Sequence, residues 1–348
     1  MKTPYKSYCL NNLAKGCKYC VKGEKLVLFI SGKCSRNCWY CSLSEKRKEK
    51  EVIWANEREI KNTKQLIGEA KESQSKGAGI TGGDPLLFLN RTLKFASSLK
   101  KEFGKKFHIH IYLPTKLVNN SNLKKLSRYI DEVRFHPEFI LNKTTISKDI
   151  EKIKLAKSYW KKQDIGIELP MIPDKKHEIL EFIKKISNEV GFINLNEFEI
   201  SDTNFNIINK KYRLSKDTYT ISKSSESGIW IIKQLNKLKI KNNVHFCTAC
   251  LKNNYQYKNR LKLHKILPFG KKTSEGTVIY LTIYLKDLSI PLKDFKKKFK
   301  GYYFDEKRKR ILLSQNSAVK LIKKGFKVAR VEEHPTYDST SMEFSYLR

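Results

Sequence analysis

The sequence predicts an α/β protein whose central sheet is parallel. Short apolar segments recur over residues 26–204, helical segments separate them, and polar residues follow several of the apolar segments. Alternation of strand and helix brings successive strands side by side in the same direction. Strands that helices cover on both faces have this short, apolar character. The pattern leaves open whether the sheet is flat or curled.

Six segments have the length and composition of strands. They are Leu26–Ser31, Ala78–Thr81, Phe107–Leu113, Ile130–Phe135, Ile165–Leu169 and Ile193–Ile200. The helices expected between them are Thr63–Ser75, Leu89–Phe103, Asn122–Tyr129, Ser147–Lys161 and Lys175–Val190. Polar residues follow these strands at Thr81–Asp84, Thr115, His136 and Ser201–Thr203. Active sites of parallel α/β folds form at the carboxyl ends of the strands, so functional residues are expected there.

The remaining sequence suggests three further segments around this core. Residues 1–25 form a cysteine-bearing lead-in to the core of residues 26–204. Residues 205–276 form a basic extension, with a helix expected over about 228–238. Residues 277–348 are expected to form a small α+β domain. Its expected strands are Val278–Leu285, Lys309–Leu313 and Lys327–Glu332, with a basic helix or loop over 292–299 and a helix over 318–324.

The chain is strongly basic, with a formal net charge of +36. Over residues 205–300 there are 22 Lys and Arg against 5 Asp and Glu. A surface of this charge attracts polyanions, so nucleic acid is the first partner to consider. A Lys-rich proteome encoded by an AT-biased genome would give the same composition without such a partner.

The sequence contains no segment that suggests export or membrane insertion. The opening MKTPYKSYCLNN lacks an apolar signal core, and the longest apolar runs are the length of strands. A cytoplasmic protein without a membrane partner is therefore expected. In that reducing compartment the 8 cysteines are expected to be metal or redox ligands rather than disulfides.

Three cysteines follow the first predicted strand in the segment Cys34-Ser-Arg-Asn-Cys38-Trp-Tyr-Cys41. A loop can wrap three such thiolates around a cubic cluster, each binding one iron. The fourth iron then keeps an open position for a small molecule. The alternatives are a zinc loop or buried thiols without a ligand, although zinc sites use four ligands with paired spacings.

The C-x3-C-x2-C spacing, with Tyr40 before the last cysteine, resembles the signature of the radical S-adenosylmethionine (SAM) superfamily. The segment Ile80-Thr-Gly82-Gly83-Asp84-Pro, at the end of the next strand, resembles the GGE-type motif of that family, with Asp in place of Glu. The resemblance covers roughly residues 26–204. It implies a partial (β/α)6 barrel that uses a [4Fe–4S] cluster and SAM.

The resemblance also implies roles for individual residues. Cys34, Cys38 and Cys41 would hold the cluster. The expected SAM-binding residues are Tyr40 near the adenine, Gly82, Gly83 and Asp84 at the methionine end, and Thr115 and Glu168. Arg134 and His136 are further candidates for contacts to the ribose and adenine, and the alternative for His136, which the sequence slightly favours, is a structural loop residue. An external donor would supply one electron, and cleavage of SAM would give methionine and a 5′-deoxyadenosyl radical that takes hydrogen from the substrate.

The other cysteines include two C-x2-C pairs far apart in the sequence, Cys17 with Cys20 and Cys247 with Cys250. If the pairs converge, they form a closed four-thiolate site for an auxiliary iron–sulfur cluster or for zinc. The alternative is that they are unrelated thiols. Cys9 stands alone.

Three functions remain open from the sequence. Cations interleave with tyrosines over residues 252–262, which suits phosphates and unpaired bases and favours modification of an RNA such as tRNA. The segment from Gly16 to Arg47 resembles an archaeal-type group related to pyruvate formate-lyase activating enzymes, which favours an activase or another protein-modifying enzyme. The third interpretation is a non-catalytic, zinc-bound nucleic-acid-binding protein.

Overall fold

The computed structural model describes residues 1–216 and 219–347, and its contacts divide the chain into two units. The first unit comprises residues 1–71 and 75–257, and the second comprises residues 72–74 with the chain from 258 onward. All of the predicted site residues belong to the first unit. The finer segment limits at 25, 204 and 276 stay predictions. None of the described helices is long and apolar enough to cross a membrane.

The first unit contains a sheet with the strand order β1-β10-β9-β8-β7-β6-β5-β2-β3-β4. Its strands are β1 (Tyr8–Leu10), β2 (Lys25–Phe29), β3 (Trp54–Ala55), β4 (Arg58–Glu59), β5 (Gly77–Thr81), β6 (His108–Pro114), β7 (Glu132–His136), β8 (Ile165–Met171), β9 (Phe192–Glu197) and β10 (Asn243–Cys247). The strands from β2 through β5–β9 to β10 run parallel, whereas β1, β3 and β4 pair antiparallel. The six predicted strands are β2 and β5–β9, so the predicted parallel α/β core is confirmed.

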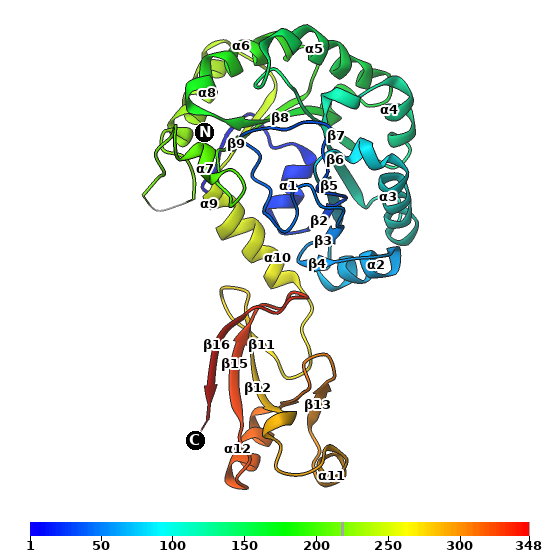
Figure 1. The fold of residues 1–348 in the computed structure, drawn as a ribbon, viewed down its shortest axis with the longest axis vertical. Coiled ribbons are helices and arrows are strands. Elements are labelled where there is room, and N and C mark those ends of the chain that lie inside the picture. Colours follow the sequence, from blue (N-terminus) through cyan, green and yellow to red (C-terminus); the bar gives the residue numbers. More distant parts are fainter. Residues whose placement is uncertain (217–218, 348) are drawn as a thin grey trace. The chain divides into compact units, whose positions relative to one another are not determined.

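The sheet is curled rather than flat (Figure 1). The helices of the first unit are α1 (Lys15–Val21), α2 (Thr63–Glu72), α3 (Leu89–Phe103), α4 (Asn120–Leu126), α5 (Ile146–Lys154), α6 (Lys176–Ile186), α7 (Phe205–Ile208), α8 (Ser224–Lys237) and α9 (Ala249–Leu251), followed by the π-helical turn Lys252–Tyr257, labelled η7. Helices α3–α6 and α8 lie outside the curved sheet, and α1 lies within the curve. The ends of the sheet, β1 and β4, do not pair with each other over the described ranges, so the barrel is partial.

The strands are apolar on the side that faces the helices and polar on the side that faces the interior. In β6, Ile109 and Ile111 belong to the apolar core, whereas the His108 ring stacks on Tyr19 of α1 at 5.6 Å. Successive side chains of a strand point to opposite faces, so this segregation follows from the alternating sequence. The curled sheet therefore encloses ionisable groups rather than a dry core.

Four strands of the sheet, β1, β3, β4 and β10, are absent from the sequence prediction. Strand β10 lies in the basic extension, where Asn243 and His245 interrupt the apolar pattern. It continues the parallel sheet beyond β9, and β1 from the lead-in pairs with it. Helix α8, which precedes β10, occupies the position where the sequence predicts a helix over about 228–238.

The second unit contains α10 (Lys258–Leu263) and an antiparallel sheet flanked by two helices. Its strands are β11 (Lys271–Lys272), β12 (Val278–Tyr284), β13 (Tyr302–Asp305), β14 (Arg310–Leu313), β15 (Ala329–Glu333) and β16 (Ser341–Tyr346), and its helices are α11 (Leu292–Lys298) and α12 (Gln315–Lys323). Phe295 of α11 and Leu321 of α12 pack on Ile283 and Ile311, which gives this unit its own core. The sequence predicts β12, β14, β15 and α12 and leaves α11 open as a helix or a loop, but it does not predict β11, β13 and β16.

A buried ion-pair network crosses the sheet of the second unit. The Arg310 side chain is fully buried, and its Nε donates to Asp305 Oδ2 at 2.9 Å. Its Nη1 and Nη2 donate to the two carboxylate oxygens of Glu333 at 2.9 and 2.7 Å. The guanidinium thus satisfies two carboxylates that would otherwise be buried without enough positive charge.

Replacing Arg310 with Met should destabilise the second unit by about 3 kcal/mol, because it leaves buried carboxylates that Arg308 compensates only in part. Replacing Arg330 with Met is the matched control. Its partner Glu343 is half exposed, so the expected cost is below about 1 kcal/mol. Urea unfolding combined with hydrogen exchange on β14 and β15 measures both effects. Equal losses in the two variants would contradict the importance of the buried network.

Candidate functional site

The three cysteines of the predicted cluster site lie in the loop between β2 and β3. This loop contains no helix or strand of its own. Contacts with the segment after β9 help to hold it in place. The Trp39 ring stacks on Tyr212 at 6.2 Å with an interplanar angle of 6°. The Thr203 hydroxyl donates to the Leu43 carbonyl at 2.6 Å. The cysteine loop is therefore held against a segment that lies about 160 residues later in the chain.

A cavity of 1310 Å³ opens beside this loop, and Cys34, Cys38 and Cys41 all line it. The other lining residues include those at the carboxyl ends of the parallel strands, where α/β folds place their sites. They include Thr81, Pro114, His136, Pro170 and Glu197. The structure thus brings the cysteine loop and the strand ends to one cavity.

The cysteine side chains of the described structure do not form a site for a single metal ion. Over residues 1–216 and 219–347, no three His, Cys, Asp or Glu side chains surround one ion-sized centre. A cubic cluster makes no such demand, because each thiolate binds a different iron. Burial raises the pKa of Cys34 and of Cys38, while the nearby Arg36 lowers both.

The glycine pair after β5 packs directly on the cysteine loop. Gly83 donates its N–H to the Ser31 carbonyl at 2.8 Å, and Asp84 donates to the Lys33 carbonyl at 3.0 Å. A Cβ on Gly83 would lie 2.2 Å from the Lys33 oxygen and 2.9 Å from the Cys34 Cβ. Gly82 has a φ of +147° that side-chain-bearing residues rarely adopt. The pair is therefore glycine because the cysteine loop leaves no room for side chains.

Two of the predicted SAM-binding residues do not line the cavity in the described structure. Asp84 is buried and accepts hydrogen bonds from the Ser35 hydroxyl at 2.5 Å and from Leu86 N at 2.9 Å. Its carboxylate thus caps the 3-10 helix Pro85–Phe88 and ties it to the cysteine loop. Thr115 donates to Asp149 at 2.5 Å, beneath the strand end. Their roles toward SAM stay predictions, and the observed contacts are structural.

Tyr40, Gly82, Gly83 and Glu168 do line the cavity. The buried Tyr40 hydroxyl lies 3.2 Å from His136 Nε2, and burial lowers the pKa of His136 to about 3. His136 is therefore neutral at physiological pH. Glu168 accepts hydrogen bonds from Asn196 at 2.7 Å and from Asn194 at 3.0 Å, so its carboxylate is held in place at the cavity wall.

Arg36 is a functional candidate that the sequence analysis does not identify. It lies between the first two cysteines of the triplet and lines the cavity. Its Nε and Nη1 atoms are buried, and neither has a hydrogen-bond partner among the described residues. Buried guanidinium donors need an anionic partner. This unsatisfied cation fits the negative charge of a thiolate-bound cluster and of the SAM carboxylate, so the residues present suit both groups.

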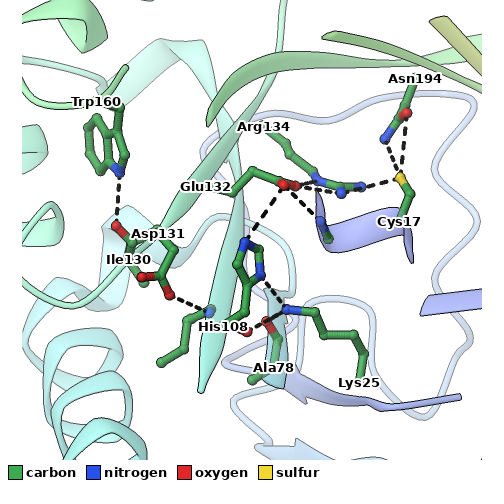
Figure 2. A network of polar contacts seen from close by, with 12 residues as sticks. Cys17, Lys25, Ala78, His108, Ile130, Asp131, Glu132, Arg134, Trp160 and Asn194 are labelled. Carbon is green, nitrogen blue, oxygen red and sulfur yellow. Dashed lines mark hydrogen bonds and ion pairs between the residues drawn. The ribbon is translucent and has the colours of Figure 1, made fainter. Parts of the chain in front are cut away.

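A buried charge network holds α1 within the barrel (Figure 2). Glu132 accepts a hydrogen bond from Gly16 N of α1 at 2.8 Å and pairs with Arg134 at 2.6 Å. Arg134 also donates to Cys17 Sγ at 3.4 Å. Lys25 Nζ lies 2.7 Å from His108 Nδ1 in the same interior. Arg134, a predicted SAM contact, is thus engaged in anchoring the N-terminal helix.

The second group of cysteines is divided between α1 and the end of β10. Cys17 and Cys20 lie on α1, Cys247 ends β10, and Cys250 follows on α9. All 8 cysteines are free of disulfides. Cys9 lies apart, on β1 opposite His245.

Some side chains of the predicted nucleic-acid-binding segment, residues 252–262, contact other residues of this chain. Lys252 pairs with Glu199 at 2.7 Å and lines the cavity. The Tyr255 ring packs edge-on against Tyr5 at 5.6 Å. These side chains connect η7 to the barrel, so they are less available to phosphates and bases than the sequence pattern indicates.

Comparison with known proteins identifies relatives. The profile of the radical SAM superfamily matches residues 28–186. A protein of Methanocaldococcus jannaschii is 44% identical over 258 residues, which cover 72% of this chain and 67% of that protein. Its name, which is provisional, is glycyl-radical enzyme activating enzyme.

Solved structures show more distant similarity. Native anSMEcpe with bound AdoMet and the Cp18Cys peptide is 17% identical, with a TM-score of 0.37, over 62% of this chain and 59% of that one. TsrM, a radical S-adenosylmethionine methyltransferase from Kitasatospora setae with tryptophan and aza-SAM bound, is 9% identical, with a TM-score of 0.38. The similarity to TsrM covers 76% of this chain and 58% of that one, so the chain spans under two thirds of both structures.

Replacing Gly83 with Ala should displace the cysteine loop, because the new methyl group would overlap the Lys33 carbonyl. We expect a loss of about 1–3 kcal/mol in stability and a marked loss of iron after anaerobic reconstitution. The control is Gly68→Ala in α2, where the nearest atom lies 3.7 Å away, so stability should be unchanged or slightly higher. Urea unfolding and iron analysis measure both. Normal iron content in the Gly83 variant would contradict the contact's role.

Proposed function

The chain belongs to the radical SAM superfamily, and from that premise we propose that it activates a partner protein by taking a hydrogen atom from a glycine Cα. The observation that carries this proposal is the 44% identity to a protein named as a glycyl-radical enzyme activating enzyme. The match extends over 72% of the chain, beyond what the 28–186 superfamily match covers. The activase hypothesis from the sequence is thereby favoured over RNA modification.

Membership also decides between the enzyme and non-enzyme hypotheses. The protein is a radical SAM enzyme, so the interpretation as a non-catalytic zinc-bound protein is wrong. The family uses a [4Fe–4S] cluster and SAM, which supply a one-electron cleavage that produces a hydrogen-abstracting radical. Cytoplasmic location and the external electron donor stay predictions.

The chain's own residues position these groups and shape the cavity. We assign the iron ligands to Cys34, Cys38 and Cys41, and the balancing positive charge to Arg36. Tyr40 and neutral His136 form one wall, where an uncharged donor and acceptor suit a nucleoside. The Gly82–Gly83 turn keeps the cysteine loop in register with the strand ends.

A glycine substrate suits this arrangement on steric grounds. Its Cα carries no side chain, so an extended segment can bring that carbon close to a buried site without displacing the cavity wall. The peptide groups of such a segment need donors and acceptors, and the cavity is lined by the polar side chains of Asn37, Lys116 and Glu138.

RNA modification is the second candidate, and the net charge of +36 is the observation that favours it. Lys252 and Tyr255, which belong to the predicted RNA-binding pattern, contact Glu199 and Tyr5 instead. The charge therefore supports association with a polyanion more than it supports a specific RNA site.

Deuterium transfer distinguishes the two substrates. The reconstituted enzyme is incubated with SAM, dithionite and an extract of cells grown on Cα-dideuterated glycine. We expect mass spectrometry to detect deuterium in 5′-deoxyadenosine, because the hydrogen comes from glycine Cα. Protease treatment of the extract should remove the signal, and ribonuclease treatment should leave it intact. Loss of the signal with ribonuclease alone would instead support RNA.

Replacing Cys38 with Ala should reduce 5′-deoxyadenosine formation to background, because the cluster loses one of its three ligands. Cys9→Ser is the matched control, since Cys9 lies on β1 outside the cavity lining, and it should keep the wild-type rate. Reverse-phase chromatography of anaerobic reactions measures both. Continued SAM cleavage by the Cys38 variant would refute the ligand assignment.

A further inference from the structure

We propose that the antiparallel sheet of the second unit binds a single strand of nucleic acid on the face opposite α11 and α12. The elements of this sheet follow one another as β12, α11, β13, β14, α12 and β15, and β16 pairs with β15 at the edge. Both helices pack on one face, as is usual for this split βαβ arrangement. The proposed site uses no residue of the first unit, so it holds whichever substrate the enzyme modifies.

The alternation of side chains along the strands places three aromatic rings on the face opposite the two helices. Ile283 of β12 packs in the core with α11 and α12, so the next residue, Tyr284, points to the other face. Leu347, which follows β16, packs in the same core. Tyr346 and Phe344 therefore share the face of Tyr284. Because one topology serves many functions, the side chains on this face decide what it can bind.

The three rings form a group that is open to solvent. Phe344 is 46% exposed and Tyr346 is 48% exposed, while Tyr284 is half-buried. The Phe344 ring centroid lies 6.1 Å from that of Tyr284 and 5.1 Å from that of Tyr346. The Tyr346 hydroxyl donates to Asp287 Oδ2 at 2.9 Å, which fixes its ring. Unpaired bases stack on aromatic rings that are presented in this way.

Three lysines lie at the same end of the sheet as Tyr284. Lys286 follows this strand, and Lys309 lies beside it, because Leu285 N donates to the Lys309 carbonyl at 2.9 Å. Lys327 precedes β15. All three side chains are exposed, and none has an ion pair in the part of the chain that the structure describes. They supply positive charge next to the rings, where the phosphates of a stacked strand would lie.

The charge of the second unit favours a polyanionic partner. Residues 258–348 contain 22 Lys and Arg against 9 Asp and Glu. Some of these carboxylates are already neutralised, since Asp305 and Glu333 pair with Arg310. An apolar partner would leave the lysines unused, and a duplex would hide its bases from the rings. A single strand engages both kinds of side chain.

Fluorescence anisotropy of the full, reconstituted chain tests the site with fluorescein-labelled oligonucleotides of about 12 nucleotides, oligo(U) and oligo(dT), at about 50 mM salt. We expect binding, and the two probes distinguish RNA from DNA. Tyr284→Leu and Phe344→Leu should each weaken it about tenfold, because leucine keeps the apolar volume but cannot stack on a base. Val319→Ala, at an exposed position of α12, is the control and should bind like the wild type.

The salt dependence tests the lysines. We expect the variant with Lys286→Gln, Lys309→Gln and Lys327→Gln to lower the slope of log affinity against log salt by about two, because three phosphate contacts are lost. The matched control removes the same charge from the helices of this unit, through Lys297→Gln, Lys320→Gln and Lys323→Gln. Its slope should change by less than about one.

Four results would overturn the proposal. They are no binding of either probe, wild-type binding by both leucine variants, equal slope changes in the two triple variants, and tighter binding of a duplex or of poly-glutamate than of the single strand. The last result would indicate an acidic protein or a general attraction to polyanions. Circular dichroism checks that each variant is folded, and the wild-type comparison of single strand, duplex and poly-glutamate needs no variant.

The outcome is independent of the proposed activase function, because deuterium transfer from glycine measures that function without nucleic acid. Loss of oligonucleotide binding with deuterium transfer intact would overturn this inference alone. Binding without deuterium transfer would leave the inference standing and count against the proposed function.

Discussion

The close contact between the cysteine loop and the Gly82–Gly83 turn is the constraint on which the rest of the site depends. Ser31 and Lys33 carbonyls accept hydrogen bonds from this turn, so the loop is attached to the strand beside β2 rather than to its own strand alone. Asp84 reinforces the attachment through Ser35. These contacts hold a loop without secondary structure in a fixed position. Cysteines that bind a cluster need to be held in this way before the cluster binds.

The sequence predicts the part of the fold that local patterns determine. Apolar runs identify β2 and β5–β9, and the C-x3-C-x2-C spacing identifies the triplet. Each of these signals is contained in a short stretch of sequence. Contacts such as that between Trp39 and Tyr212 depend on the tertiary fold and leave no local signal. Asp84 illustrates the same limit, since its capping of the 3-10 helix Pro85–Phe88 is evident only from the fold, while its role toward SAM stays a prediction.

The polar interior of the barrel does leave a signal in the sequence. The segment His108-Ile-His-Ile-Tyr alternates polar and apolar residues, and Glu132-Val-Arg-Phe-His does the same. Such alternation is typical of a strand with two different environments. The prediction that helices cover the strands on both faces does not take this alternation into account. The alternation in both segments therefore predicts a curled sheet whose inner face carries ionisable groups.

The enclosed charges in turn explain why a short helix lies inside the barrel. Glu132 is 1% exposed and Arg134 is 2% exposed, so each needs partners that water cannot supply. Helix α1 supplies Gly16 N to the carboxylate and Cys17 sulfur to the guanidinium. A side chain at position 16 would overlap Arg134, Glu132 and His110, so glycine is required for this approach. The same interactions that satisfy the buried charges therefore place the N-terminal cysteines inside the barrel.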